Sequence, residues 1–185
     1  MLEIEAKFKV SDAEKIRALL AAMGLQPEKA KPICQMDEYF QGVGRDFRQT
    51  GEALRLRIED GRYCFTYKGK PDLENKGTKI RREIELELSG NNPAEARDFL
   101  IKLGFQPVGI VAKKRWQYIW GDSPGHGTVA LDEVEKLGTF IEVEFLVEEE
   151  DRDSATRRIE EIARCLELAK PEPRSYLRMV MEEIC

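Results

Sequence analysis

The sequence predicts a mainly β, α+β fold: an eight-stranded antiparallel β-barrel, closed into a tunnel, with helices packed outside. Eight segments alternate apolar and charged residues with a period of two, which is typical of strands with one face in a core. Four other segments show helix caps or helical spacing of apolar residues. Closing the eight strands into a barrel removes exposed sheet edges and turns one face of every strand toward a lumen.

The strands are expected near residues 2–8, 36–41, 53–59, 62–68, 80–88, 111–120, 127–133 and 139–147. A two-residue turn, Asp60-Gly61, joins the third and fourth strands into a hairpin. Pairing across this turn places three bases on one face of the hairpin and its large apolar residues on the other. The three bases are Arg55, Arg57 and Lys68.

The helices are expected at 12–23, 93–103, 153–168 and 174–184. The first follows Ser11, an N-cap with Glu14 three positions on, and ends at Gly24. The second follows Asn92 and has proline at its first position. The third shows the helical spacing of apolar residues that predicts one buried face.

Composition excludes several classes of protein. With 185 residues, 42% of them hydrophobic and 35% charged, the chain is expected to form one globular domain over 1–185. The net charge of −5 argues against nucleic acid as a partner. Apolar runs are too short to span a membrane, and the N-terminus lacks the pattern of a signal peptide, so the expected location is the cytoplasm.

Cysteine and histidine offer little catalytic chemistry. The four cysteines are scattered, which argues against a zinc cluster or a disulfide framework: Cys34, Cys64, Cys165 and Cys185. The single histidine, His126, lies in the Gly/Pro-rich stretch GDSPGHG, and we interpret it as a residue of a hairpin loop.

Charges of one sign recur along single strands and segregate between strands. Bases gather on the central hairpin and at 113–115, and acids on the first and last strands. Like charges at this spacing repel each other unless a ligand intervenes. A sheet with one face in water alternates in the same way, so a structural domain with a solvated charged face stays an alternative.

A ligand that carries both signs of charge would satisfy both clusters. Carboxylate oxygens bind divalent cations, and several Arg and Lys side chains bind a polyphosphate. The pattern therefore predicts a site for a metal-chelated triphosphate. On this interpretation Glu3 and Glu5 hold the metal and Lys7 contacts phosphate.

Six motifs in order along the chain resemble the CYTH family, also called triphosphate tunnel metalloenzymes. The motifs are the Glu-x-Glu-x-Lys of MLEIEAKFKV, then ALRLR, TYKG, RREIE, KKR and LDEVEKLGTFIEVE. The family includes class IV adenylate cyclases, thiamine triphosphatases and inorganic triphosphatases. The resemblance implies a tunnel barrel, dependence on Mg²⁺ or Mn²⁺, and a homodimer.

Residue roles follow from matching positions in the motifs. Metal-site carboxylates are implied at Glu3, Glu5, Glu142 and Glu144. Triphosphate binding is implied for Lys7, Arg55, Arg57, Lys68, Arg81, Lys113 and Arg115. Three positions match the catalytic region: Lys7, Asp132 near the metal or the reacting phosphate, and Tyr39 near the mouth. The acidic pair Glu83 and Glu85 either binds metal or orients the bases, and the less similar stretch 42–52 is expected to form a lid or substrate-facing loop.

The resemblance leaves the reaction open. A class IV adenylate cyclase-like enzyme would convert ATP to cyclic AMP and pyrophosphate, whereas a triphosphatase would hydrolyse thiamine triphosphate or inorganic tripolyphosphate. A module that binds a triphosphate or polyphosphate without turnover is the alternative. The carboxylates favour an enzyme, because anion binding alone does not need them.

Overall fold

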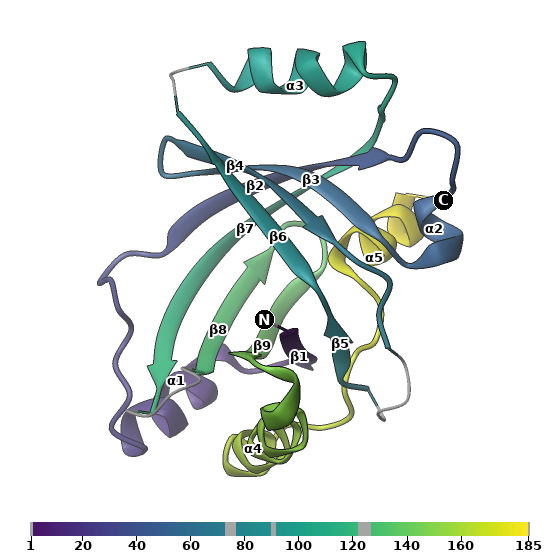
Figure 1. Ribbon diagram of the computed structural model, residues 1–185. Coiled ribbons are helices and arrows are strands. Elements are labelled where there is room, and N and C mark those ends of the chain that lie inside the picture. The colour runs from purple at the N-terminus through teal and green to yellow at the C-terminus, as the bar shows by residue number, and fades with distance from the viewer. Residues whose placement is uncertain (1, 73–76, 90–91, 122–126, 185) are drawn as a thin grey trace.

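The computed structural model describes residues 2–72, 77–89, 92–121 and 127–184. In this part of the chain, nine strands form one antiparallel sheet that curls into a nearly closed barrel, which confirms the predicted fold class (Figure 1). The strands are β1 (Leu2–Val10), β2 (Ile33–Gln41), β3 (Ala53–Glu59), β4 (Arg62–Lys68), β5 (Lys79–Arg81), β6 (Glu83–Leu88), β7 (Gln106–Trp120), β8 (Gly127–Val134) and β9 (Gly138–Val147). Their order in the sheet is β5-β1-β9-β8-β7-β2-β3-β4-β6. His126 and Cys185 lie outside the described residues.

The barrel closes at a seam formed by one short piece of chain. The strand predicted at 80–88 is two strands: β5 pairs with β1, and β6 pairs with β4. Arg82 separates them, and its carbonyl accepts a hydrogen bond from Gly69 N at 2.9 Å. The chain changes partner at this point because it must leave one edge of the sheet and join the other. The prediction of eight strands is corrected to nine for this reason.

The central hairpin has the predicted register. Asp60 and Gly61 have φ values of 46° and 81°, as a tight two-residue hairpin turn requires. Arg55 pairs with Thr66 and Arg57 with Cys64, as the alternation predicted. The bases therefore face the lumen and the large apolar residues face outward.

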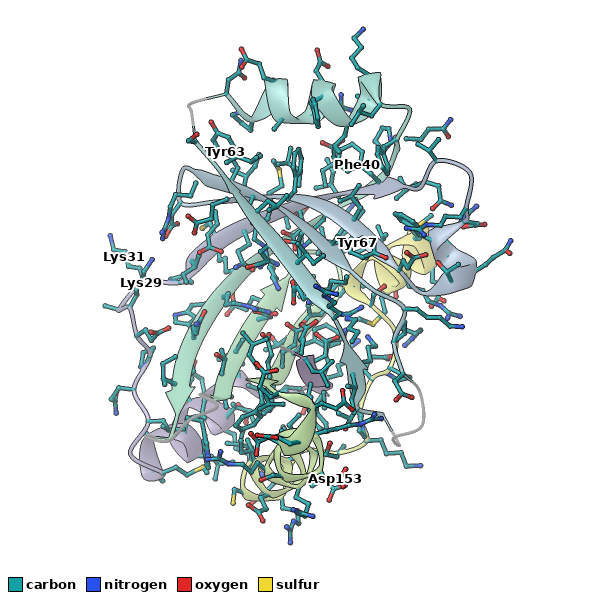
Figure 2. All side chains as sticks on the ribbon, viewed as in Figure 1. Lys29, Lys31, Phe40, Tyr63, Tyr67 and Asp153 are labelled. Atoms are coloured by element: carbon teal, nitrogen blue, oxygen red, sulfur yellow. The ribbon has the colours of Figure 1, made fainter. Side chains whose placement is uncertain are left out.

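Helices cover the outer surface of the barrel on two sides and approach it at one end (Figure 1). The helix α3 (Pro93–Lys102) covers β2, β3 and β4, and Phe40 and Tyr63 lie beneath it (Figure 2). On the other side, α1 (Ala13–Ala22) and α4 (Arg152–Cys165) pack on β1, β8 and β9. The C-terminal helix α5 (Tyr176–Ile184) packs against an end of the barrel. The apolar core thus lies outside the sheet, and the lumen is left to charged residues.

Several helix boundaries differ from the prediction. The N-cap of α1 is Asp12 rather than Ser11, because the Asp12 carboxylate accepts a hydrogen bond from Lys15 N at 2.9 Å. The helix predicted at 153–168 ends at Cys165, and Glu167 adopts a left-handed φ of 52° just beyond it. The stretch 42–52 contains a short helix, α2 (Phe47–Thr50). A 3-10 turn, η1 (Glu149–Asp151), precedes α4. None of the helices described here is long and apolar enough to cross a bilayer.

We expect Leu56→Ala to lower the free energy of unfolding by about 2–5 kcal/mol, because it leaves a cavity under α3. Leu56 is 2% exposed, whereas Leu86 on the same sheet is 59% exposed and serves as the control. Urea denaturation of both variants measures the difference. Equal losses at the two positions would contradict the outward orientation of Leu56.

Candidate active site in the barrel lumen

The lumen holds a cavity of about 1080 Å³. Every residue that the sequence predicted for the site lines this cavity except Asp132, which is fully buried behind its wall. The side chains come from strands all around the barrel, and α5 contributes Tyr176 and Leu177 at one end. The barrel therefore gathers into one space residues that lie far apart in the sequence.

Asp37 on β2 holds the two arginines of the central hairpin. Arg57 donates two hydrogen bonds to its carboxylate, at 2.7 and 2.9 Å, and Arg55 donates a third at 3.3 Å. Burial raises the pKa of Asp37, but the two guanidinium groups outweigh it and hold this pKa well below the usual range. The Nε of Arg55 is buried and has no hydrogen-bond partner within the described part of the chain. This cluster therefore retains a donor for an anion.

Asp132 on β8 holds a second pair of bases in the same way. Its carboxylate accepts hydrogen bonds from Arg115 at 2.7 and 2.6 Å, from Lys113 at 3.2 Å, and from the Tyr176 hydroxyl at 3.0 Å. Asp132 is 0% exposed. Its carboxylate is placed to orient the two bases from behind, and the cavity wall separates it from a ligand in the lumen.

Two lysines share the ring of Tyr176. The Lys7 ammonium lies 4.3 Å from the ring centroid and that of Lys113 lies 5.1 Å from it. Burial lowers the pKa of Lys7 to about 8, against the attraction of Glu142. Burial and the adjacent Arg115 lower the pKa of Lys113 to about 8 as well. Both ammonium groups are therefore short of compensating charge.

An acidic cluster forms where β1, β6 and β9 approach each other. Carboxylate oxygens of Glu3, Glu83 and Glu144 all lie within 4.8 Å of one another. The pKa of Glu3 is raised by burial and by Glu5, and the pKa of Glu144 is raised by burial and by repulsion from Glu5 and Glu83. Lys68 contacts Glu3 and lies 3.0 Å from Glu83, which offsets part of the repulsion. Three converging carboxylates that repel each other are a donor set that suits Mg²⁺ or Mn²⁺.

The other two predicted metal carboxylates contact bases instead. Glu5 accepts a hydrogen bond from Arg81 at 2.9 Å and lies 3.6 Å from Lys79. Glu142 accepts a hydrogen bond from Arg115 and lies 4.0 Å from Lys7. The structure thus places two residues of the predicted metal set, Glu3 and Glu144, in the acidic cluster and the other two outside it.

The remaining predicted residues have mainly orienting contacts. Tyr39 is buried and pairs with Arg55 across β2 and β3, whereas the ring against Lys7 is that of Tyr176. Glu85 accepts a hydrogen bond from Thr66 at 3.1 Å and is not part of the acidic cluster.

The sequence interpretation missed two residues that contact the lumen bases or the aspartate that holds them. Asp37 shares the inward face of β2 with Tyr39, so the alternation of DEYF and its neighbours could have identified it. Tyr176 is the first residue of α5, and helical spacing does not reveal that its hydroxyl reaches Asp132.

A family model described as the CYTH domain matches residues 1–176. The chain belongs to the CYTH family. This family acts on triphosphate substrates.

Named relatives cover almost the whole chain. A Methanocaldococcus jannaschii protein, provisionally named an adenylate cyclase, is 36% identical over 97% of this chain and 98% of its own length. A solved Pyrococcus horikoshii structure is 35% identical, with a TM-score of 0.81 over 98% of this chain and 99% of that one.

A Hippeastrum protein shares the fold at lower identity. It is provisionally called an adenylyl cyclase, and its structure is described with a dominant triphosphatase activity. Its identity to this chain is 18%, with a TM-score of 0.67 over 98% of this chain and 96% of its own.

We expect the affinity for tripolyphosphate to fall as the pH rises through about 8, because Lys7 and Lys113 lose their charge there in the free protein. A bound anion favours the ammonium form, so binding above this pH takes up protons. Calorimetry from pH 7 to 9.5 measures the slope. Lys113→Arg keeps its charge and should show a shallower fall, by up to about tenfold per pH unit.

The ionisation of tripolyphosphate itself is the same for both proteins, so the comparison isolates the lysine. Superimposable pH profiles for the two proteins would show that Lys113 does not titrate against the ligand.

Proposed function

We propose that this protein is a metal-dependent enzyme that cleaves a phosphoanhydride bond of a triphosphate inside the barrel. The observation that carries the proposal is the juxtaposition of a basic cluster and an acidic cluster in one cavity. The basic cluster comprises Lys7, Arg55, Arg57, Lys113 and Arg115, and the acidic cluster comprises Glu3, Glu83 and Glu144.

The basic cluster contains more positive charges than the carboxylates that face it can neutralise. Its five bases face the carboxylates of Asp37, Asp132, Glu142 and Glu83, the last of which belongs to the acidic cluster, and Arg55 retains a buried donor. Arg and Lys side chains aimed at phosphate oxygens stabilise the charge that develops as a phosphoryl group is transferred. Because two aspartates fix these bases from behind, they need little reorganisation when a triphosphate binds.

The acidic cluster would hold a Mg²⁺ or Mn²⁺ ion through Glu3, Glu83 and Glu144. Such an ion would neutralise phosphate charge and polarise the phosphorus that is attacked. Lys68 and Arg81 contact Glu3 and line the same cavity, so they would also be available to the phosphate chain. These side chains would bind and orient the phosphate chain and limit the access of water to it.

Two reactions use the same charged residues. Attack by the ribose 3′-hydroxyl on the α-phosphorus of ATP gives cyclic AMP and pyrophosphate, and the name of the Methanocaldococcus jannaschii relative favours this cyclase reaction. Attack by water on the terminal phosphorus gives a diphosphate and phosphate. The activity described for the Hippeastrum protein supports this hydrolysis as the second candidate.

A single panel tests the proposal. ATP, thiamine triphosphate and tripolyphosphate are each incubated with Mg²⁺ or Mn²⁺, and the products are resolved by chromatography. We expect metal-dependent product from at least one substrate, with cyclic AMP and pyrophosphate marking a cyclase. Binding without any product would instead favour a triphosphate-binding module.

We expect tripolyphosphate to stabilise the fold by about 4 kcal/mol at a thousandfold excess over its dissociation constant. The anion relieves repulsion among bases that come from several strands, whereas Mg²⁺ alone should add little. Rising salt should reduce the shift because the attraction is electrostatic. A thermal-shift titration in low salt measures it, and no shift would exclude the lumen as an anion site.

We expect Glu144→Gln to abolish metal-dependent turnover while raising the melting temperature of the metal-free protein at pH 7–8 by about 2–4 °C. The pKa of Glu144 is raised in the folded state, so its ionised form lowers stability above that pKa. The gain should vanish near pH 4, where the unfolded chain also becomes protonated.

The exposed Glu87, mutated to Gln, serves as the control and should change neither property. Retained turnover in Glu144→Gln at saturating Mg²⁺ would remove Glu144 from the metal site.

A further inference from the structure

Gln35 has a buried acceptor that its surroundings leave unused. It lies on β2, is 5% exposed, and lines the lumen. Its Oε1 has no hydrogen-bond partner within the described residues. The assigned roles do not use this side chain, since it belongs neither to the basic cluster nor to the acidic cluster.

The orientation of the Gln35 amide is fixed by a neighbour. Its Nε2 donates a hydrogen bond to the Glu59 carboxylate at 2.5 Å. A carboxylate accepts hydrogen bonds, so the NH₂ end of the amide must face Glu59. The carbonyl oxygen is therefore held as an acceptor, and a buried acceptor is costly to leave without a donor.

Gln35 lies beside the basic cluster along the lumen. It pairs with Lys113 across β2 and β7, and it precedes Asp37 by one inward-facing position, which is about 7 Å along a strand. Further toward the barrel end near Lys29 and Lys31, opposite α5 in Figure 2, Gln117 lines both the main cavity and a smaller one of about 170 Å³. Gln117 thus adds a second uncharged polar side chain to the lining, beyond Gln35.

The dimensions of the lumen leave space for more than phosphate. Its volume of about 1080 Å³ is at the upper end of the range for pockets that enclose a drug-sized organic molecule. A tripolyphosphate on the basic cluster has only oxygen atoms, and at neutral pH it offers no strong donor to the Gln35 oxygen. The unused acceptor is therefore available to a donor from another part of the substrate.

We propose that Gln35 is a specificity-determining residue that accepts a hydrogen bond from an exocyclic amino group on the organic part of the substrate. The inference rests on the proposed function and narrows it to organic triphosphates that carry an amino-substituted ring. Adenosine and thiamine triphosphates share this chemistry, and inorganic tripolyphosphate lacks it.

Equilibrium calorimetry without divalent metal tests the proposal with two nucleotides. ATP and purine riboside triphosphate differ only in the 6-amino group, so their phosphate contacts cancel in the comparison. We expect the wild-type protein to bind ATP about 10- to 100-fold more tightly, the effect of leaving one buried acceptor unpaired. Gln35→Met should reduce this ratio to about one while leaving the affinity for tripolyphosphate unchanged.

Thiamine triphosphate separates the two sources of the amino group. If the amino group belongs to thiamine, Gln35→Met weakens its binding at least tenfold and the two purine nucleotides bind alike. In that case Gln35 still selects the aminated ring. Binding of all three organic triphosphates that is indifferent to Gln35→Met would overturn the proposal.

Two further variants guard against a structural explanation. Glu59→Gln supplies an amide that can donate to the Gln35 oxygen, so it should abolish the preference with Gln35 itself intact. Gln35→Met should not lower the melting temperature, whereas a merely structural role for the amide would. Leu177→Ala, at the α5 end of the cavity, is the matched control and should preserve the preference.

The proposed function and this inference fail differently. Product formation together with binding of all three organic triphosphates that is indifferent to Gln35→Met overturns the role of Gln35 alone. Discrimination without product overturns the enzyme and leaves Gln35 as the selectivity residue of a binding protein.

Discussion

Neutralisation of buried bases by two aspartates is the interaction on which this structure depends. Asp37 and Asp132 each accept hydrogen bonds from two bases, and each is almost completely buried. Without them, bases on adjacent strands would face one another in a lumen from which water is partly excluded. Because the carboxylates lie behind the bases, they leave the lumen side of each base available. The same contacts that offset repulsion among the bases therefore leave these bases available to the proposed anion.

The strict partition of side chains between the two faces of the sheet follows from the period of two. Outward residues such as Leu131 and Ile141 pack under helices and are fully buried, while Lys113 and Glu3 on neighbouring strands face inward. Tyr176 of α5 joins the two environments, because its ring packs with Phe140 and its hydroxyl donates a hydrogen bond to Asp132. The C-terminal helix is thus tied to the charge network as well as to the core.

Parity and turn chemistry made much of this arrangement predictable. The Asp60-Gly61 turn determined the hairpin register, and with it the inward position of Arg57. The offset between neighbouring strands along the barrel axis was not predictable, because the sequence of one strand does not determine which residues of its neighbours lie level with it. This offset brings Glu83 and Glu144 to Glu3 but leaves Glu5 outside the group, so the membership of the acidic cluster could not be inferred from residue type. The change of strand partner at Arg82 was not predicted either, because the alternation of charged and apolar residues continues from β5 into β6.

The pairing of the first strand has a consequence for synthesis of the chain. Leu2 pairs with Val147, and Glu3 pairs with Arg81, so β1 has no complete set of neighbours until most of the protein has been translated. During translation the hairpin of β3 and β4 can form locally, but the N-terminal strand must wait with its carboxylates in water. β1 therefore leaves the ribosome long before its partner β9, and the acidic cluster, which joins Glu3 to Glu144, forms late in folding.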